Sequence, residues 1–237
     1  MVSQKKFAMI ILSQDMSKYH LKYSDDIFLS PNNSFSKIVS LLPLNPKNIL
    51  DIGCSSGFLG KYIKAKHKCF YCGLDNNSSD LVIAKKFIDK TIIINLETQK
   101  IVTQTPSVKF DVIILADILE HLTHPEKILK QLPKISAPHA TIIISVPNII
   151  HQSVLINLLQ RKWEYQSTGI MDNTHLRFFS KISISKLITN SGFKINKIIS
   201  TTKNEKLPLF LKPLRLYLQH PDFSNYQYII KATTKNE

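Results

Sequence analysis

Short runs of apolar residues recur along the chain, and within each run the apolar positions are continuous rather than alternating. Continuous runs of this length are typical of strands that are covered on both faces, as in the middle of a parallel sheet. The pattern predicts strands at seven places: Asn48–Ile52, Cys69–Leu74, Thr91–Asn95, Phe110–Ala116, Thr141–Val146, Phe193–Ser200 and Tyr226–Lys231.

Stretches with helical character separate most of these runs. Helices are predicted at Phe58–Ala65, Ser79–Ile88 and Pro125–Ile135, and a proline at the start of the last one suits a first helical position. The alternation of strands and helices indicates an α/β fold in which right-handed crossovers build a parallel sheet with helices on both faces.

The length and composition of the chain fit one large globular domain. It has 237 residues, of which 43% are hydrophobic and 20% charged, and this balance excludes a disordered or collagen-like protein. We expect residues 1–45 to form an N-terminal extension and residues 46–237 to form the domain. Within the domain, we expect residues 151–180 to be an insertion over the edge of the sheet that carries the site.

The charge of the chain first indicates a polyanionic partner. Lysine and arginine number 31 against 17 acidic residues, and the formal net charge is +14. Arginine occurs only at Arg161, Arg177 and Arg215, however, and lysine is the poorer residue for bidentate recognition of phosphates or bases. We therefore interpret the charge mainly as compositional bias, and nucleic acid is disfavoured as the partner. The basic surface still favours an anionic acceptor.

The sequence predicts neither a membrane span nor a disulfide framework. No segment approaches the ~18 consecutive apolar residues that a span needs, and no small-residue cleavage site follows the charged start at Lys5 and Lys6. The cysteines number three, and the CxxC pair Cys69 and Cys72 lies in a predicted strand, where residues three apart point to opposite faces. We expect a reduced, cytoplasmic protein, either a monomer or a homodimer.

The strongest chemical motif joins the first predicted strand to the first predicted helix. Asp51 is followed by the turn Gly53-Cys54-Ser55-Ser-Gly57, and the helix begins directly after it. Glycines in such a turn let the backbone approach a ligand closely, and the start of a helix offers free N–H donors. A dinucleotide-binding turn would have the spacing GxGxxG, which this turn lacks.

Polar residues also follow the next two predicted strands. Asp75 comes 24 positions after Asp51, close to where an acid in a nucleoside-binding α/β domain binds the ribose hydroxyls, with Asn76 beside it. The alternative interpretation of Asp75 is a residue that forms the turn. Asn95 and Leu96 follow the third strand, where an amide and an apolar side chain suit the edge of an adenine ring.

These motifs resemble those of the class I S-adenosylmethionine-dependent methyltransferases. Asp51–Gly57 matches the first motif of that family, Asp75 its ribose-binding acid, and Asn95-Leu96 its adenine-binding segment. The segment from Phe110 to His121, with Ala116 and Asp117 in the cofactor site, matches the motif at strand four. Ser55 stands where the family usually has a glycine, and Asn95 where it usually has an aspartate.

The resemblance implies both a fold and a cofactor. The expected fold is a Rossmann-like sheet of seven strands, mostly parallel with the last strand antiparallel, and the expected cofactor is S-adenosyl-L-methionine. This cofactor has no pyrophosphate, so its turn needs room for an amino-acid group rather than for phosphate oxygens. The chain is therefore expected to be a methyltransferase.

Two further segments resemble bacterial methyltransferases that are associated with glycosyltransferases of polysaccharide synthesis. They are Ser145–Asn148 and Gly169–Ser180. The resemblance implies a small-molecule or sugar-linked acceptor, and we place Asn148 and Arg177 among the substrate-binding residues. The sequence Ala116-Asp117-Ile-Leu stands where methyltransferases of amino groups on nucleic acid bases carry their signature, so base methylation is disfavoured.

Methyl transfer from a sulfonium is an in-line displacement in which the protein aligns the reactants and excludes water. An alcohol acceptor must also lose its proton, so a base that is neutral near pH 7 helps. Asp117, Glu120 and His121 have the spacing of one face of a helical turn after strand four. We predict His121 and His175 as general bases and Arg177 as a clamp for an anionic group of the acceptor.

Several alternatives remain open. Asp117, Glu120, His121 and His175 together could hold a divalent metal, as in metal-assisted O-methyltransferases of the ubiquinone-biosynthesis or small-RNA 2′-O-methylating type, although our main interpretation assigns no metal. The charge alone favours an RNA-directed enzyme. The apolar and basic residues 207–218 favour a lipid-linked acceptor, and a cofactor fold that serves as a non-enzymatic partner subunit is the last alternative.

Overall fold

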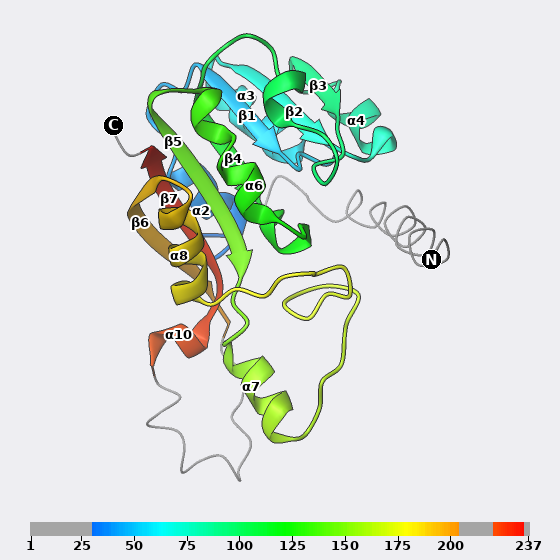
Figure 1. Ribbon diagram of the computed structural model, residues 1–237, viewed down its shortest axis with the longest axis vertical. Coiled ribbons are helices and arrows are strands. Elements are labelled where there is room, and N and C mark those ends of the chain that lie inside the picture. The colour runs from blue at the N-terminus through cyan, green and yellow to red at the C-terminus, as the bar shows by residue number, and fades with distance from the viewer. Residues whose placement is uncertain (1–29, 204–219, 235–237) are drawn as a thin grey trace.

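The computed structural model describes residues 30–203 and 220–234. Its seven strands form one sheet in the order β3-β2-β1-β4-β5-β7-β6, shown in Figure 1. Every neighbouring pair is parallel except the two that involve β7, so the predicted sheet with an antiparallel last strand is confirmed. The strands are β1 (Asn48–Ile52), β2 (Phe70–Asp75), β3 (Lys90–Ile93), β4 (Phe110–Ala116), β5 (Ser136–Pro147), β6 (Phe193–Thr202) and β7 (Asn225–Thr234).

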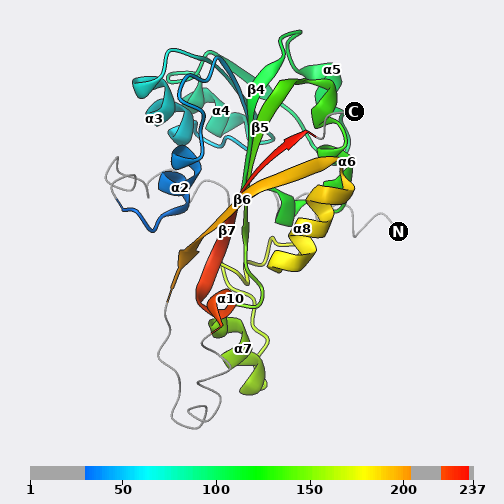
Figure 2. The same ribbon diagram turned by 90° about the vertical axis from the view of Figure 1, so that its left-hand side faces the viewer.

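Helices cover both faces of the sheet, as Figure 2 shows with the sheet seen nearly edge-on. Side chains of α2, α3 and α4 pack on one face with Ile49 and Ile114. Side chains of α5, α6 and α8 pack on the other face with Leu50 and Ile113. The helices are α2 (Ser34–Ser40), α3 (Phe58–Lys66), α4 (Ser78–Ala84), α5 (Ile101–Gln104), α6 (Pro125–Leu129), α7 (Gln152–Leu159), α8 (Lys181–Asn190) and α10 (Pro221–Ser224).

The element boundaries differ most from the prediction at α6 and β5. The helix predicted at Pro125–Ile135 is wrong, because α6 ends at Leu129 and a separate 3-10 helix follows at Leu132–Lys134. Pro133 accounts for the break, since a proline disfavours helical backbone at the preceding residue and lacks an N–H donor. The strand β5 begins five residues before the predicted Thr141, and its register with β4 shifts between the pairs Phe110–Ser136 and Val112–Thr141.

The part of the predicted N-terminal extension that the structure describes packs on the sheet. Asn33 caps α2 by accepting a hydrogen bond from the Phe35 N–H, a usual arrangement at a helix start. Ile38 and Leu41 are buried in the same apolar cluster as Ile49. Burial of two large side chains contributes about 3–6 kcal/mol to folding, so residues 30–45 take part in the core.

The sheet order places the site. The chain moves from β1 outward to β2 and β3, and then returns to the other side of β1 with β4 and β5. In open α/β sheets, ligands bind at such a reversal, beyond the carboxyl ends of the strands.

Among the residues that the structure describes, no helix combines the length and the apolar character needed to cross a membrane. The charged start at Lys5 and Lys6 and the segment 207–218 lie outside the described residues.

Candidate functional site

The turn after β1 has a left-handed backbone at three positions. Gly53 has φ +81°, Ser55 φ +46° and Gly57 φ +75°. A β-carbon on Gly53 would lie 2.8 Å from the Ile118 side chain, and one on Gly57 would lie 2.9 Å from the Ala84 side chain. Both glycines are therefore needed for conformation, and Gly57 is also needed for space, because Ala84 has no flexible side chain that could move aside. The left-handed backbone of Ser55 explains why glycine is the usual residue there.

Asp75, at the end of β2, holds this turn in place. One carboxylate oxygen accepts a 2.7 Å hydrogen bond from the Ser55 N–H, and the other accepts a 2.9 Å bond from the Asn77 N–H. The hydrogen bond to Asn77 is the interaction expected if Asp75 serves to form the turn, which is the alternative interpretation of this residue. A carboxylate has about four acceptor positions, so these two bonds leave capacity for ribose hydroxyls.

Asp51, near the end of β1, and Cys54, within the turn, are both buried. Burial raises the pKa of Asp51 to about 7, although the Tyr71 hydroxyl donates a 2.8 Å hydrogen bond to this carboxylate. Burial also raises the pKa of the Cys54 thiol far above its ordinary value, so the sulfur stays protonated. Cys54 packs closely on Gly73, where a β-carbon would lie 2.5 Å from the Cys54 sulfur.

The segments predicted to bind the ribose and the adenine follow β2 and β3. Asn76 and Asn95 are exposed, and Leu96 is half-buried against the core. The Asn95 side-chain oxygen accepts a 2.9 Å hydrogen bond from the Glu97 N–H. The local turn therefore uses the side-chain oxygen, and the amide nitrogen is the atom of this group that can donate to a ligand.

Asp117 does not lie on a helical face with Glu120 and His121, so that expectation is wrong. Its backbone is left-handed, with φ +52°, and the short 3-10 helix begins only at Leu119. Its carboxylate accepts hydrogen bonds from the Ser145 hydroxyl, at 2.7 Å, and from the Gln227 amide. Asp117 is thus directed toward β5 and β7. Ala116, at the end of β4, is half-buried beside it.

Three of the four predicted metal-ligating residues are close together. One ligand atom each from Glu120, His121 and His175 lies within 4.8 Å of the others. The two imidazole rings meet edge to face with their centroids 4.8 Å apart. The structure therefore brings His121 and His175, which are 54 positions apart in the sequence, to one point.

The electrostatics of this cluster are unusual. Glu120 is only 1% exposed, and within residues 30–203 and 220–234 neither of its carboxylate oxygens has a hydrogen-bond partner. Burial raises the pKa of Glu120 well above its ordinary range, and the charge of Asp117 adds to the effect. Burial lowers the pKa of His121 to about 4, with His175 contributing in the same direction, so His121 is neutral at pH 7. An unpartnered buried carboxylate beside a neutral imidazole is a set of donors that fits a cation.

Arg177 and Asn148 are both held by backbone carbonyls. The Arg177 guanidinium is exposed and donates hydrogen bonds of 3.1 and 2.7 Å to the Thr123 carbonyl. Asn148 is completely buried, and its amide donates 2.7 Å bonds to the carbonyls of Asp222 and Asn225. The predicted substrate-binding role of Asn148 is therefore corrected to a structural one, because its amide faces the interior and its donors are used.

The segment of residues 151–180 is attached directly to the cluster. The N–H groups of Leu176 and Arg177 donate hydrogen bonds of 2.8 and 2.9 Å to the Glu120 carbonyl. In Figure 1 the yellow-green loop that carries these residues returns from α7 to the carboxyl end of β5. The Phe178 ring centroid lies 6.3 Å from that of His175 and 6.2 Å from that of Trp163. Aromatic rings thus extend from the two histidines outward.

Sequence reasoning missed the residues that orient this cluster. Ser145 and Gln227 hold Asp117, while Asp172 and Thr174 lie beneath His121. Asp172 and Thr174 stand beside His175 in the segment from Gly169 to Ser180, and that proximity could have marked them. Gln227 is 110 positions from Asp117, and only the pairing of β5 with β7 brings it near.

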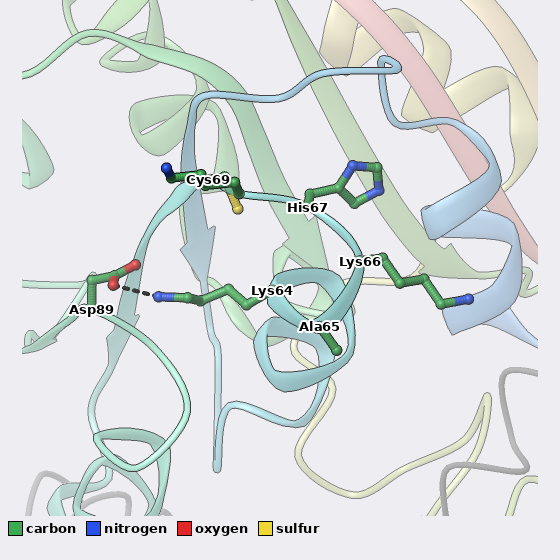
Figure 3. Close-up of a pocket in the computed structure, with 7 residues that line it drawn as sticks. Lys64, Ala65, Lys66, His67, Cys69 and Asp89 are labelled. Atoms are coloured by element: carbon green, nitrogen blue, oxygen red, sulfur yellow. Dashed lines mark hydrogen bonds and ion pairs between the residues drawn. The ribbon is translucent and has the colours of Figure 1, made fainter.

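A separate pocket of about 480 Å³ lies between the end of α3 and the start of β2, shown in Figure 3. Its lining includes Lys64, Lys66 and Lys68, and Lys64 forms an ion pair with Asp89. Cys69 of the CxxC pair opens onto this pocket, whereas Cys72 is buried in β2. All three cysteines are free thiols. The pair therefore forms neither a disulfide nor a part of the candidate site.

The sheet order, the glycine turn and the acid after β2 define an S-adenosylmethionine-dependent methyltransferase of class I. A profile described as a methyltransferase domain matches residues 31–198, and the chain belongs to this family. S-adenosylmethionine is accordingly its methyl donor.

Curated relatives of the chain are O-methyltransferases. The chain is 22% identical to the ubiquinone biosynthesis O-methyltransferase of Coxiella burnetii over 65% of its own length. The match spans 66% of that enzyme, slightly less than two thirds. The chain is also 23% identical to the mitochondrial ubiquinone biosynthesis O-methyltransferase of Dictyostelium discoideum, over 93% of this chain and 70% of that protein.

Solved structures share the fold. A methyltransferase from Aquifex aeolicus aligns with a TM-score of 0.61 and 16% identity, over 93% of this chain and 99% of that one. A methyltransferase from Mesorhizobium loti aligns with a TM-score of 0.60 and 13% identity, over 84% and 96% of the two chains. At these identities the likeness concerns the fold.

Proposed function

We propose that this methyltransferase transfers the methyl group to a hydroxyl of a small molecule, and that a divalent cation assists the transfer. The observation that carries the proposal is the buried Glu120 carboxylate, which finds no hydrogen-bond partner in the part of the chain that the structure describes and lies beside His121 and His175. A buried unpaired carboxylate is costly, so a compensating cation accounts for its position. The names of the curated relatives support oxygen as the methylated atom.

In this proposal the cofactor lies along the carboxyl ends of β1, β2, β3 and β4. The turn after β1 faces its amino-acid group, Asp75 its ribose, and the segment after β3 its adenine. The residues proposed to bind it are Asp51, Gly53, Cys54, Ser55, Gly57, Asp75, Asn76, Asn95, Leu96, Ala116 and Asp117.

Glu120, His121 and His175 would hold the cation, whose charge would polarise the acceptor hydroxyl and ease the loss of its proton. Nε2 is the nitrogen of each histidine that would hold the cation, because each Nδ1 is directed at a backbone carbonyl. Where no cation is bound, the same Nε2 atoms are the ones able to accept the hydroxyl proton. The chain itself aligns the hydroxyl oxygen with the methyl carbon and the sulfur, and it excludes water.

Residues 151–180 are proposed to cover the acceptor side of the site. Phe178 and Trp163 offer ring faces beside His175, and such faces pack on the rings of both phenols and sugars. Arg177 uses part of its guanidinium on Thr123, and the remaining N–H groups are exposed to an anionic group of the acceptor. The acceptor side therefore suits both a glycan-linked and a phenolic acceptor, and the experiment must include one probe of each class.

The experiment titrates Mn²⁺ alone into the purified protein and follows binding by calorimetry. Wild type should bind one equivalent of Mn²⁺. Glu120→Gln should weaken this binding at least ~10-fold, because loss of even an outer partner of a metal ligand has an effect of that size. Glu126→Gln is the matched control, because Glu126 lies six positions away, half-exposed beside His124. Equal binding by wild type and Glu120→Gln, or no binding by either, would refute the cation site.

The acceptor is tested with two probes, a dihydroxybenzoate and a methyl glycoside, under saturating S-adenosylmethionine. Methylation of either hydroxyl supports the proposed reaction and identifies the acceptor class. Loss of that activity with a chelator, and its return with Mn²⁺ or Mg²⁺, ties the reaction to the cation. Activity that withstands exhaustive chelation would leave His121 and His175 as the bases and would exclude the cation.

A further inference from the structure

A short turn beneath the two histidines, residues 170–175, supplies a hydrogen-bond acceptor for each imidazole ring. The His175 Nδ1 lies 3.0 Å from the Ile170 carbonyl oxygen. The His121 Nδ1 lies 3.3 Å from the Thr174 carbonyl oxygen and 3.2 Å from the Thr174 hydroxyl. The turn therefore contacts both rings on the same nitrogen.

The direction of each hydrogen bond follows from the chemistry of the partners. A carbonyl oxygen only accepts, so the His175 Nδ1 must donate to Ile170. The Thr174 hydroxyl lies 2.6 Å from an Asp172 carboxylate oxygen, which also only accepts, and so the hydroxyl proton points to Asp172. The Thr174 oxygen is then left to accept from His121, whose Nδ1 must carry the hydrogen.

Asp172 is well placed to fix this chain of bonds. It is only 4% exposed, and the same carboxylate oxygen accepts a 2.8 Å hydrogen bond from the Thr174 N–H. The His175 N–H donates to the Asp172 carbonyl at 3.1 Å, which closes the turn. The following residues, Leu176 and Arg177, bond to the Glu120 carbonyl, so the turn cannot move independently of Glu120.

We propose that Asp172 and Thr174 are positioning residues that set the tautomer of His121. With Nδ1 protonated on both rings, Nε2 is the nitrogen of each ring that keeps a lone pair for a cation held beside Glu120. The use of these lone pairs rests on the proposed function, whereas the tautomer itself is a property of the protein alone.

The first experiment measures the tautomer directly in protein free of metal and cofactor. Long-range ¹H–¹⁵N correlation spectra distinguish a protonated Nδ1 from a protonated Nε2, and His121→Gln and His175→Gln assign the signals. We expect both residues as the Nδ1-protonated form in wild type. A predominantly Nε2-protonated His121 would overturn the proposal, whether or not the chain binds a cation.

The second experiment removes the hydroxyl and then restores it. Thr174→Val should reduce the Nδ1-protonated fraction of His121 and weaken Mn²⁺ binding by roughly 10-fold, the lower end of effects seen for outer partners of metal ligands. Thr174→Ser should restore both, because serine keeps the hydroxyl. Thr103→Val, which removes an exposed hydroxyl on α5, is the matched control and should change neither.

A separate variant keeps the test valid if Thr174→Val fails to fold. Asp172→Asn retains the shape of the side chain but can donate toward the Thr174 oxygen, and it should broaden the tautomer distribution of His121 alone. Unchanged tautomers in both variants, with folding verified by circular dichroism, would overturn the positioning role and leave the proposed function standing. Conversely, a wild-type protein with both histidines in the Nδ1-protonated form but without Mn²⁺ binding would refute the proposed cation site and leave the positioning role standing.

Discussion

The backbone N–H of Ser55 donates a 2.7 Å hydrogen bond to the carboxylate of Asp75. This bond joins the turn after β1 to the acid at the end of β2, which are 20 positions apart. The two features that identify the cofactor pocket in the sequence are therefore one physical unit. A change at Asp75 acts on the ligand and on the turn together.

Asp75→Ala should weaken binding of S-adenosylmethionine by about 1.5–3 kcal/mol, the contribution of a hydrogen bond to a charged group. Asp75→Asn should also weaken it, since its NH₂ group would face either the Ser55 or the Asn77 donor. Calorimetry with S-adenosylmethionine and with its demethylated product measures both. An affinity equal to that of wild type in both variants would show that the ribose assignment is wrong.

Gly57→Ala should destabilise the protein by about 2–4 kcal/mol, because it combines a left-handed residue with a steric clash. Gly57 has φ +75°, and the new β-carbon would lie 2.9 Å from the Ala84 side chain. Gly192→Ala is the matched control, since Gly192 has φ +93° but no atom within 4 Å of a β-carbon. Urea denaturation of both variants separates the two effects, and equal losses would exclude the clash with Ala84.

Much of the fold could be predicted because its signals are local. A continuous apolar run such as Phe110–Ala116 reports burial on both faces, and the turn from Gly53 to Gly57 is set by backbone conformation. The prediction of one long helix at Pro125–Ile135 failed because a single residue within it disfavours helical backbone. Pro133 divides the helix predicted after Pro125.

The candidate site was predictable in part for the same reason. His121 and His175 were recognisable as basic residues in motifs, and the structure places them together. Asp117 was assigned to a helical face because the spacing suited a regular helix, whereas its left-handed backbone directs it to Gln227. That partner comes from an antiparallel strand far along the chain, which no spacing near Asp117 reveals.

Glu120→Gln should stabilise the protein in the absence of divalent cations, although it abolishes the proposed cation site. The Glu120 side chain is 1% exposed and has no hydrogen-bond partner among the described residues, so folding must either bury its charge or take up a proton. A neutral amide of the same shape relieves that cost, and we expect a gain of roughly 1–3 kcal/mol. Thermal denaturation with a chelator measures it. A loss of stability would show that the Glu120 charge is compensated within the protein itself.

Asp51→Asn should flatten the pH dependence of stability. The pKa of Asp51 is raised from 3.8 to about 7, first by burial and further by the charge of Asp75. The folded state therefore retains a proton that the unfolded state has lost. The stabilisation from this group is complete below pH 3.8, declines as the pH rises, and is lost above about pH 7. The decline amounts to roughly 2–4 kcal/mol.

Urea denaturation of cofactor-free protein at several pH values between about 4.5 and 8 tests this coupling. The difference in unfolding free energy between Asp51→Asn and wild type should grow as the pH rises, because other titrating groups cancel in the difference. The amide oxygen introduced by Asp51→Asn would still accept the hydrogen bond from Tyr71, so the packing beneath the glycine turn is preserved. Tyr71→Phe removes that bond while keeping the carboxylate, and it should raise the pKa of Asp51 further and steepen the decline. Parallel curves for wild type and Asp51→Asn would mean that Asp51 is already ionised in the folded protein at low pH.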